Sequence, residues 1–218
     1  MKYKKIVIGF IILFGLINIK TQCGRQMPQR PDYKYSFSEK MTASPYQLNY
    51  NEGDTIMLQL NVPGKKLFDT KTNARIFFDS ASLPITVAVN LVFNNPYIGD
   101  GPFASFIYSQ GISAYTQSYS GTTYASITTG CTASNDYTVT VGVVLIKKGV
   151  FALSVSGNDL THCFNGYSAY AQFMLLLDVD HTHKSYYQQL PFSDIGKIQD
   201  NNIITGLDRK NAAIINVQ

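Results

Sequence analysis

Apolar and polar residues alternate with a period of two along much of the chain after residue 33. The stretch from Thr55 to Val62 shows this clearly, because every second residue from Ile56 onward is aliphatic. Side chains on a β-strand point alternately to its two faces, so the pattern predicts strands with one buried face. The same alternation predicts strands at 33–37, 74–78, 85–93, 137–146, 150–155, 170–178 and 212–217.

The longest alternating stretch runs from Tyr137 to Ser156, and we expect it to lie at the centre of the fold. Lys147, Lys148 and Gly149 interrupt the apolar pattern, which resumes at once on the other side. A short turn signal that contains glycine, placed between two β-branched runs, indicates a β-hairpin. The sequence therefore predicts a central hairpin here.

Helical periodicity is weak in this chain. The stretch from Ser185 to Leu190 predicts one helical turn, and residues 192–209 are expected to be rich in loops. Short strands separated by turn residues favour a sandwich, and nearly 190 residues after position 32 suit one such domain. The expected fold class is all-β, an antiparallel Ig-like β-sandwich formed by residues 33–218.

The first 32 residues have a different character. A basic start, Met1–Lys5, precedes an apolar run from Ile6 to Ile19, which is typical of a signal peptide and shorter than the roughly 20 residues of a membrane-spanning helix. Cys23 follows this run as in the lipobox of bacterial lipoproteins, whose cysteine is acylated after cleavage. We expect a signal peptide at 1–22, a lipidated tether at 23–32, and a location in the cell envelope at the outer membrane, facing the periplasm or the surface. Ordinary secretory cleavage nearby is the alternative.

The number of cysteines agrees with lipidation. The chain has three of them, and an odd thiol in an exported protein needs an explanation. If Cys23 carries lipid, Cys131 and Cys163 remain, and an exported protein can join such a pair in a disulfide bond. The alternative role for Cys163 is that of a thiolate activated by His162. Adjacent residues in an extended segment point apart, which favours the disulfide.

The net charge of the full chain comes from its first residues. The chain has 18 basic and 14 acidic residues, and four of the basic ones precede Cys23 with no acidic residue among them. The mature chain therefore has 14 of each sign and is formally neutral. Nucleic-acid binding requires a basic face on the folded domain, so the composition gives no support to a nucleic-acid partner.

Residues 101–135 form a segment without any charged residue, crowded with serine, threonine, glycine and aromatic residues. Tyrosine presents a large apolar face with a polar tip, which suits contact with proteins or sugar rings. We single out Phe106, Tyr108 and Tyr115 as candidate binding residues for an envelope protein or a glycan.

A purely structural role explains the same composition, because tyrosine and threonine are good strand formers. The absence of tryptophan from the chain also weakens the argument for a glycan. We expect Tyr119 and Tyr124 to be structural and Tyr115 to be exposed.

Residues 178–183 form the best candidate for a metal site. In an extended segment His181 and His183 share one face, with Asp180 or Asp178 nearby, and these side chains are ligands for divalent ions. The alternative function is therefore a metal-dependent hydrolase. Two histidines and two carboxylates after an apolar strand also suit a solvated loop, and no general base can be assigned.

The order of features resembles a group of uncharacterised envelope lipoproteins of the Bacteroidota. The resemblance lies in the signal ending at Cys23, in Tyr33–Phe37, in Glu52–Ile56, in Lys148–Ser154, and in Cys163 with the apolar strand after it. It implies an envelope location and a β-rich fold, and it brings no catalytic residues and no cofactor. The first hypothesis is therefore a non-enzymatic lipoprotein that binds a partner or has a structural role.

Overall fold

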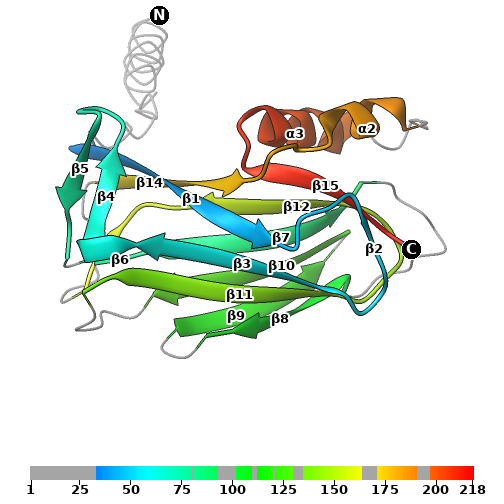
Figure 1. The fold of residues 1–218 in the computed structure, drawn as a ribbon, viewed down its shortest axis with the longest axis horizontal. Helices are drawn as coiled ribbons and strands as arrows, with labels where there is room; N and C mark the ends of the chain where they lie inside the picture. The colour runs from blue at the N-terminus through cyan, green and yellow to red at the C-terminus, as the bar shows by residue number, and fades with distance from the viewer. Residues whose placement is uncertain are drawn as a thin grey trace, which may run out of the picture. The chain divides into compact units, whose positions relative to one another are not determined.

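Two β-sheets packed face to face form most of the structure (Figure 1). This computed structural model describes residues 33–79, 81–92, 102–109, 112–119, 121–129, 135–163, 171–190 and 197–218. Residues from Tyr33 to Gln218 form one compact unit. The predicted all-β sandwich is confirmed, with mostly antiparallel pairing. The predicted signal peptide and lipidated tether lie outside the described residues.

Sheet A has seven strands, ordered β5–β4–β1–β3–β11–β8, with β14 paired to β1. Its strands are β1 (Tyr35–Ser44), β3 (Thr55–Val62), β4 (Lys66–Asp69), β5 (Ala74–Phe77), β8 (Ala104–Tyr108), β11 (Tyr137–Leu145) and β14 (Ala171–Asp178). The pairing of β1 with β14 is parallel and covers eight positions. A short 3-10 helix, η2 (Pro63–Lys65), joins β3 to β4.

Sheet B has six strands, ordered β2–β15–β12–β7–β10–β9. Its strands are β2 (Asn49–Tyr50), β7 (Pro84–Leu91), β9 (Ile112–Tyr119), β10 (Thr122–Thr129), β12 (Gly149–Gly157) and β15 (Ala212–Val217). A separate two-stranded ladder pairs β6 (Ala81–Ser82) with β13 (Thr161–His162).

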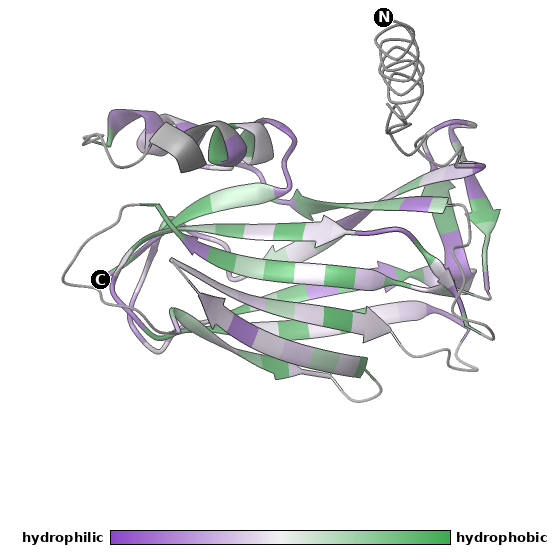
Figure 2. Ribbon diagram, turned by 180° about the vertical axis from the view of Figure 1, so that it is seen from behind, coloured by the Kyte–Doolittle hydropathy of each residue, from purple (hydrophilic) through white to green (hydrophobic). Residues whose placement is uncertain are grey.

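The core lies between the two sheets, where the alternating aliphatic residues meet. In β7 every second residue from Ile85 to Leu91 is buried, and the hydropathy bands along the strands in Figure 2 follow this alternation. Leu58 of β3, Val141 of β11 and Leu153 of β12 are fully buried in the same cluster. Burying one such side chain contributes about 1.5–3 kcal/mol, so the hydrophobic pattern sets which face of each strand turns inward.

The predicted central hairpin is wrong in its pairing. Strands β11 and β12 form at the expected positions, but β11 pairs with β3 and β8 in sheet A, while β12 pairs with β7 and β15 in sheet B. The connection through Lys147 and Lys148 crosses from one sheet to the other. Both strands bury one face against the core. This burial is the same whether the two strands pair with each other in one sheet or lie in opposite sheets.

Two helices pack on the outer face of sheet B, and the sequence prediction missed one of them. Helix α2 (Lys184–Gln189) matches the predicted helical turn, whereas α3 (Lys197–Asp208) replaces a predicted loop. Ile203 and Leu207 of α3 form a second apolar cluster with Ala152 and Ile214 of the sheet. Packing therefore stabilises a helix whose own residues favour it weakly.

Gly206 allows this helix to approach the sheet closely. A Cβ atom at this position would lie 2.9 Å from the Cβ of Ala212. Among the described residues, none of the helices is long and apolar enough to cross a membrane.

Candidate functional site

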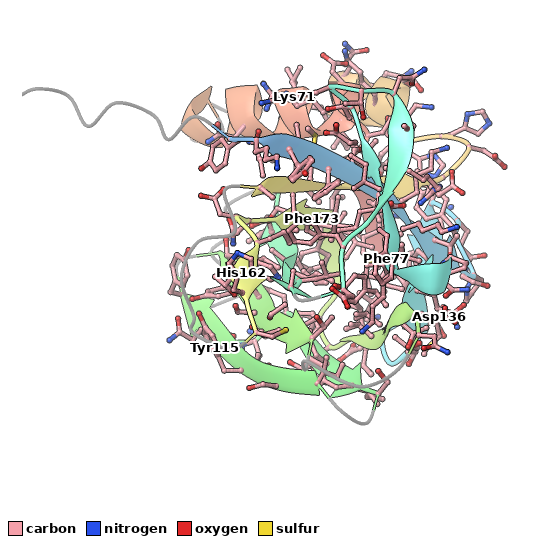
Figure 3. The ribbon with its side chains drawn as sticks, turned by 90° about the vertical axis from the view of Figure 1, so that its left-hand side faces the viewer. Lys71, Phe77, Tyr115, Asp136, His162 and Phe173 are labelled. Carbon is pink, nitrogen blue, oxygen red and sulfur yellow. The ribbon has the colours of Figure 1, made fainter. Side chains whose placement is uncertain are left out.

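Three tyrosines gather on the outward face of β9 and β10, and we call them the tyrosine cluster: Tyr115, Tyr119 and Tyr124. Their ring centroids are 6.3 Å apart for Tyr115 and Tyr124 and 5.8 Å apart for Tyr119 and Tyr124, with the rings nearly perpendicular in both pairs. Tyr115 is 55% exposed and Tyr119 is 62% exposed. Figure 3 shows Tyr115 on the surface of these strands.

The strand register explains why these rings meet. Tyr124 of β10 lies opposite Gln117 of β9, so Tyr115 and Tyr119 are its two diagonal neighbours on the same face. The Tyr124 hydroxyl donates a hydrogen bond to Gln117 Oε1. Desolvation, followed by the influence of Tyr115 and Tyr119, raises the pKa of Tyr124 above its ordinary value.

The expectation that Tyr119 is structural is wrong, because its side chain is more exposed than that of Tyr115. Tyr124 is half-buried, as a structural role requires, and Tyr115 is exposed as expected. The period-two spacing of Tyr115 and Tyr119 already places them on one face of a strand. The sequence did not reveal which face turns outward, because β9 has few aliphatic residues.

Phe106 and Tyr108 do not belong to the tyrosine cluster. They lie on β8 in sheet A, half-buried against the core, with their rings stacked 6.5 Å apart. The hydroxyls of Tyr108 and Thr116 of β9 form a 2.7 Å hydrogen bond. Phe106 and Tyr108 therefore cover the space between the ends of the two sheets, and the structure separates them from the third candidate, Tyr115.

A groove lies on the outer face of sheet B, and sequence reasoning missed it. It has a volume of about 450 Å³ and lies between helix α3 and the floor made by β7 and β12. Asn90 accepts a hydrogen bond from Thr122 on its Oδ1 and donates one to Ser154 Oγ. Arg209 is the single charged residue among the described residues that line the groove.

The Asp180, His181 and His183 stretch forms the rim of a shallow pocket of about 520 Å³ near the start of α2. Lys184, Asp208 and Lys210 line the same pocket, and Lys184 forms an ion pair with Asp208, so this carboxylate is already engaged by an ammonium group. In the described part of the chain, no group of three or more histidine, cysteine, aspartate or glutamate side chains is arranged to hold a metal ion. The metal site stays a prediction without geometric support.

His183 has a structural environment that differs from that of a solvated loop. Its backbone has φ 55°, its ring stacks on Tyr46 at 5.3 Å, and its carbonyl accepts a hydrogen bond from the Tyr187 amide. Burial, and then the nearby charge of His181, lowers the pKa of His183 below its ordinary value. His181 and Asp180 are exposed, so the three side chains lie in different environments.

The three cysteines are only partly within the structure. Cys163 directly follows β13, while Cys23 and Cys131 lie outside the described residues. Lipidation of Cys23 and the disulfide between Cys131 and Cys163 therefore stay predictions.

Comparison with known proteins shows no family for this chain. No family model matches it, and no curated protein matches it. Among solved structures, it is similar to a non-cellulosomal cohesin from the hyperthermophilic archaeon Archaeoglobus fulgidus, with 10% identity and a TM-score of 0.31 over 71% of this chain and 99% of that one. It is also similar to the type II cohesin dyad from the adaptor ScaA scaffoldin of Acetivibrio cellulolyticus, with 10% identity and a TM-score of 0.31 over 66% of this chain and 49% of that one.

Proposed function

We propose that this protein is a non-enzymatic binding module of the cell envelope. In this proposal the lipid on Cys23 anchors it in the outer membrane, and the tyrosine cluster holds a protein partner. The single observation that carries the proposal is the exposure of Tyr115 and Tyr119 around Tyr124 on one sheet face. Tyrosine is enriched among the residues that dominate binding energy at interfaces.

The surroundings of the tyrosine cluster indicate the chemistry of the partner. Gln117, Thr122 and Ser126 are the neighbours on the outward face, so hydrogen-bonding groups without charge surround the rings. The partner is therefore expected to present apolar side chains and uncharged polar groups there. Such a surface places no large unpaired charge in the interface, which would be costly to desolvate.

The ring geometry favours a protein over a glycan. Tyr115 and Tyr119 are inclined at 77° and 82° to Tyr124, so the three rings do not form one flat platform for stacked sugars. Rings that stand at right angles instead present both faces and edges to side chains of a partner. A glycan partner is kept as an outcome of the test.

Photo-crosslinking in intact envelopes tests this proposal. A photoreactive phenylalanine analogue replaces Tyr115 in the full-length protein, and the same analogue replaces Gln59 as the control. Gln59 is also exposed on a strand, in sheet A. We expect a discrete protein adduct from position 115 and none from position 59.

The yield of the adduct from position 115 should also depend on Tyr119. Tyr119→Ala should lower the yield from position 115 about tenfold, as loss of about 1.4 kcal/mol of binding energy does. Identical adducts from positions 115 and 59 would overturn the proposal. If the group attached to position 115 resists protease and is degraded by glycosidases, the partner is a glycan and not a protein.

Mass spectrometry tests the anchor separately. We expect a mature N-terminus at Cys23 that carries acyl chains, and peptides containing Cys131 and Cys163 that stay joined until a reductant is added. An unmodified Cys23 would remove the anchor from the proposal, and free thiols at both other positions would remove the disulfide.

A further inference from the structure

Strand β9 has a free edge. It pairs with β10 at all eight of its positions, and within the described ranges no strand pairs with its other side. The backbone N–H and C=O groups along such an edge are a template for another strand. This edge is therefore a candidate interaction surface that is distinct from the outward face of the sheet.

The usual protections of an edge strand are missing from β9. Natural edges are shortened, or carry charges or proline that prevent pairing. β2 has two residues, and β5 has four and carries Arg75. β9 has eight residues, Ile-Ser-Ala-Tyr-Thr-Gln-Ser-Tyr, with no charge and no proline. Of the strands that end the two sheet orders, it is the longest; the five-residue β8 also lacks charge and proline.

The sequence of β9 is nearly palindromic around Gln117. Tyr115 and Tyr119 lie two positions to either side of it, and the hydroxyl residues Thr116 and Ser118 lie between. A two-fold symmetric interface requires a surface that is complementary to itself. In antiparallel pairing of β9 with a second β9, Gln117 faces its own copy, Tyr115 faces Tyr119 of the second copy, and Thr116 faces Ser118.

We propose that a second copy of this chain pairs antiparallel with β9 in this register. Aromatic pairs directly across two strands stabilise a sheet, and like charges in that position destabilise it. The register supplies two tyrosine pairs and no charge. It also joins two six-stranded sheets into one continuous sheet, with the two tyrosine clusters adjacent on its outward face.

The dimer depends on the membrane for its strength. One strand pair buries less than the roughly 1,200–2,000 Å² of a standard stable interface, so the dimer is weak in dilute solution. Two copies held by lipid in one membrane meet at a high effective concentration. The pairing rests on the lipid anchor of the proposed function, and it would itself give a crosslink from position 115. The mass of the adduct separates the two proposals, because self-pairing gives an adduct of twice the mass of this chain, while a different partner gives an adduct that contains peptides of another protein.

Disulfide trapping tests the pairing. The variant Gln117→Cys is prepared as full-length lipidated protein, placed in vesicles of neutral phospholipid and oxidised, with Gln59→Cys as the matched exposed control. Residues opposite each other across two strands lie about 4.5–5.5 Å apart between Cα atoms, which a disulfide can bridge. We expect at least ten times more disulfide-linked dimer from Gln117→Cys than from the control. Equal yields would overturn the pairing.

Two further variants test the register. Tyr115→Cys and Tyr119→Cys should cross-link when mixed, and each alone should give only background, because each faces the other residue in the second copy. When Gln117→Lys is added to both of these cysteine variants, the mixed disulfide dimer should disappear, because two lysines face each other. When one cysteine variant carries Gln117→Lys and the other carries Gln117→Glu, the dimer should return. Cross-linking of Tyr115→Cys with itself, or dimers unaffected by Gln117→Lys, would contradict this register.

Discussion

Two regions of the sandwich use polar residues in opposite ways. The charged end is formed by β1, β4 and β5 and contains Glu39, Asp69 and Arg75. The neutral side is formed by β8, β9 and β10 and contains the tyrosine cluster. Figure 3 shows Lys71 of the β4–β5 connection and Tyr115 of the neutral side far apart, at the top and bottom of the view.

At the charged end, carboxylates satisfy the backbone. Asp69 is 0% exposed and accepts hydrogen bonds from the Ser36 amide at 2.8 Å and from the amide and hydroxyl of Thr72 at 3.1 and 2.8 Å. Glu39 is 6% exposed, accepts from the Phe68 amide at 2.7 Å and pairs with Arg75 at 2.9 Å. These side chains connect β1 to the β4–β5 hairpin.

On the neutral side, large side chains remain available for contact. Tyr115 and Tyr119 touch Tyr124 at its edges and leave most of their surface in solvent. The difference indicates that the charged end stabilises the fold, while the neutral side carries surface that the fold itself does not need. The predictions below test this contrast by comparing stability losses at the two regions.

The largest effect is expected for Asp69→Ala. The substitution leaves the part-buried backbone donors of Ser36, Lys71 and Thr72 without their acceptor, at a cost of about 1 kcal/mol or more for each, so we expect a loss of about 3 kcal/mol in the free energy of unfolding. Urea denaturation at neutral pH measures it. A loss of stability smaller than that of Tyr119→Ala would contradict the view that the charged end, and not the neutral side, stabilises the fold.

A smaller loss, about 2 kcal/mol, is expected for Glu39→Ala, because it leaves the Phe68 amide unpaired and removes the partner of Arg75. Arg75→Ala should cost less than Glu39→Ala, since Arg75 is largely exposed. The same urea experiment compares the two variants. Equal losses would mean that the ion pair with Arg75, and not the hydrogen bond from the Phe68 amide, dominates the contribution of Glu39.

The tyrosine cluster should contribute little to stability. Tyr124→Ala removes two edge-to-face contacts, and we expect a loss of about 1 kcal/mol. Tyr115→Ala and Tyr119→Ala each remove one contact from an exposed ring and should cost about 0.5 kcal/mol. Losses of core size in all three variants would show that the cluster is structural, and would remove the basis of the proposed binding surface.

The smallest expected effect is a change in the free energy of unfolding in mild acid. Burial opposes ionisation of Asp69, but its hydrogen bonds from Ser36, Thr72 and Lys71 outweigh burial and hold its pKa below the ordinary value of 3.8. Its stabilising contribution is therefore complete above about pH 4 and is lost as the pH falls through the lowered pKa. Between pH 5 and 3.5 wild-type stability should fall slightly more than that of Asp69→Ala. The measurement is urea denaturation of the wild type and of Asp69→Ala at several pH values. If Asp69 had no role, the two plots of unfolding free energy against pH would be parallel.

The sequence predicted the strands that bury one clearly aliphatic face, because this burial imposes a period of two that is visible without a structure. It did not predict β4 or the strands β8, β9 and β10 around the tyrosine cluster. It did not predict how the strands pair. The alternation around Lys147–Gly149 suits a hairpin and a crossing between sheets equally, since both bury the same residues. Helix α3 was missed for a related reason, because its stability depends on contacts of Ile203 and Leu207 with the sheet.

The candidate site divides in the same way. The sequence by itself determined that the segment around Tyr115 is uncharged and aromatic, because composition is a local property, but it predicted no particular strand there. Only the tertiary structure decided that Phe106 and Tyr108 turn toward the core, that Tyr119 is exposed, and that β9 ends its sheet. Exposure and pairing depend on which strands become neighbours, and that choice is made by the packing of residues far apart in the chain.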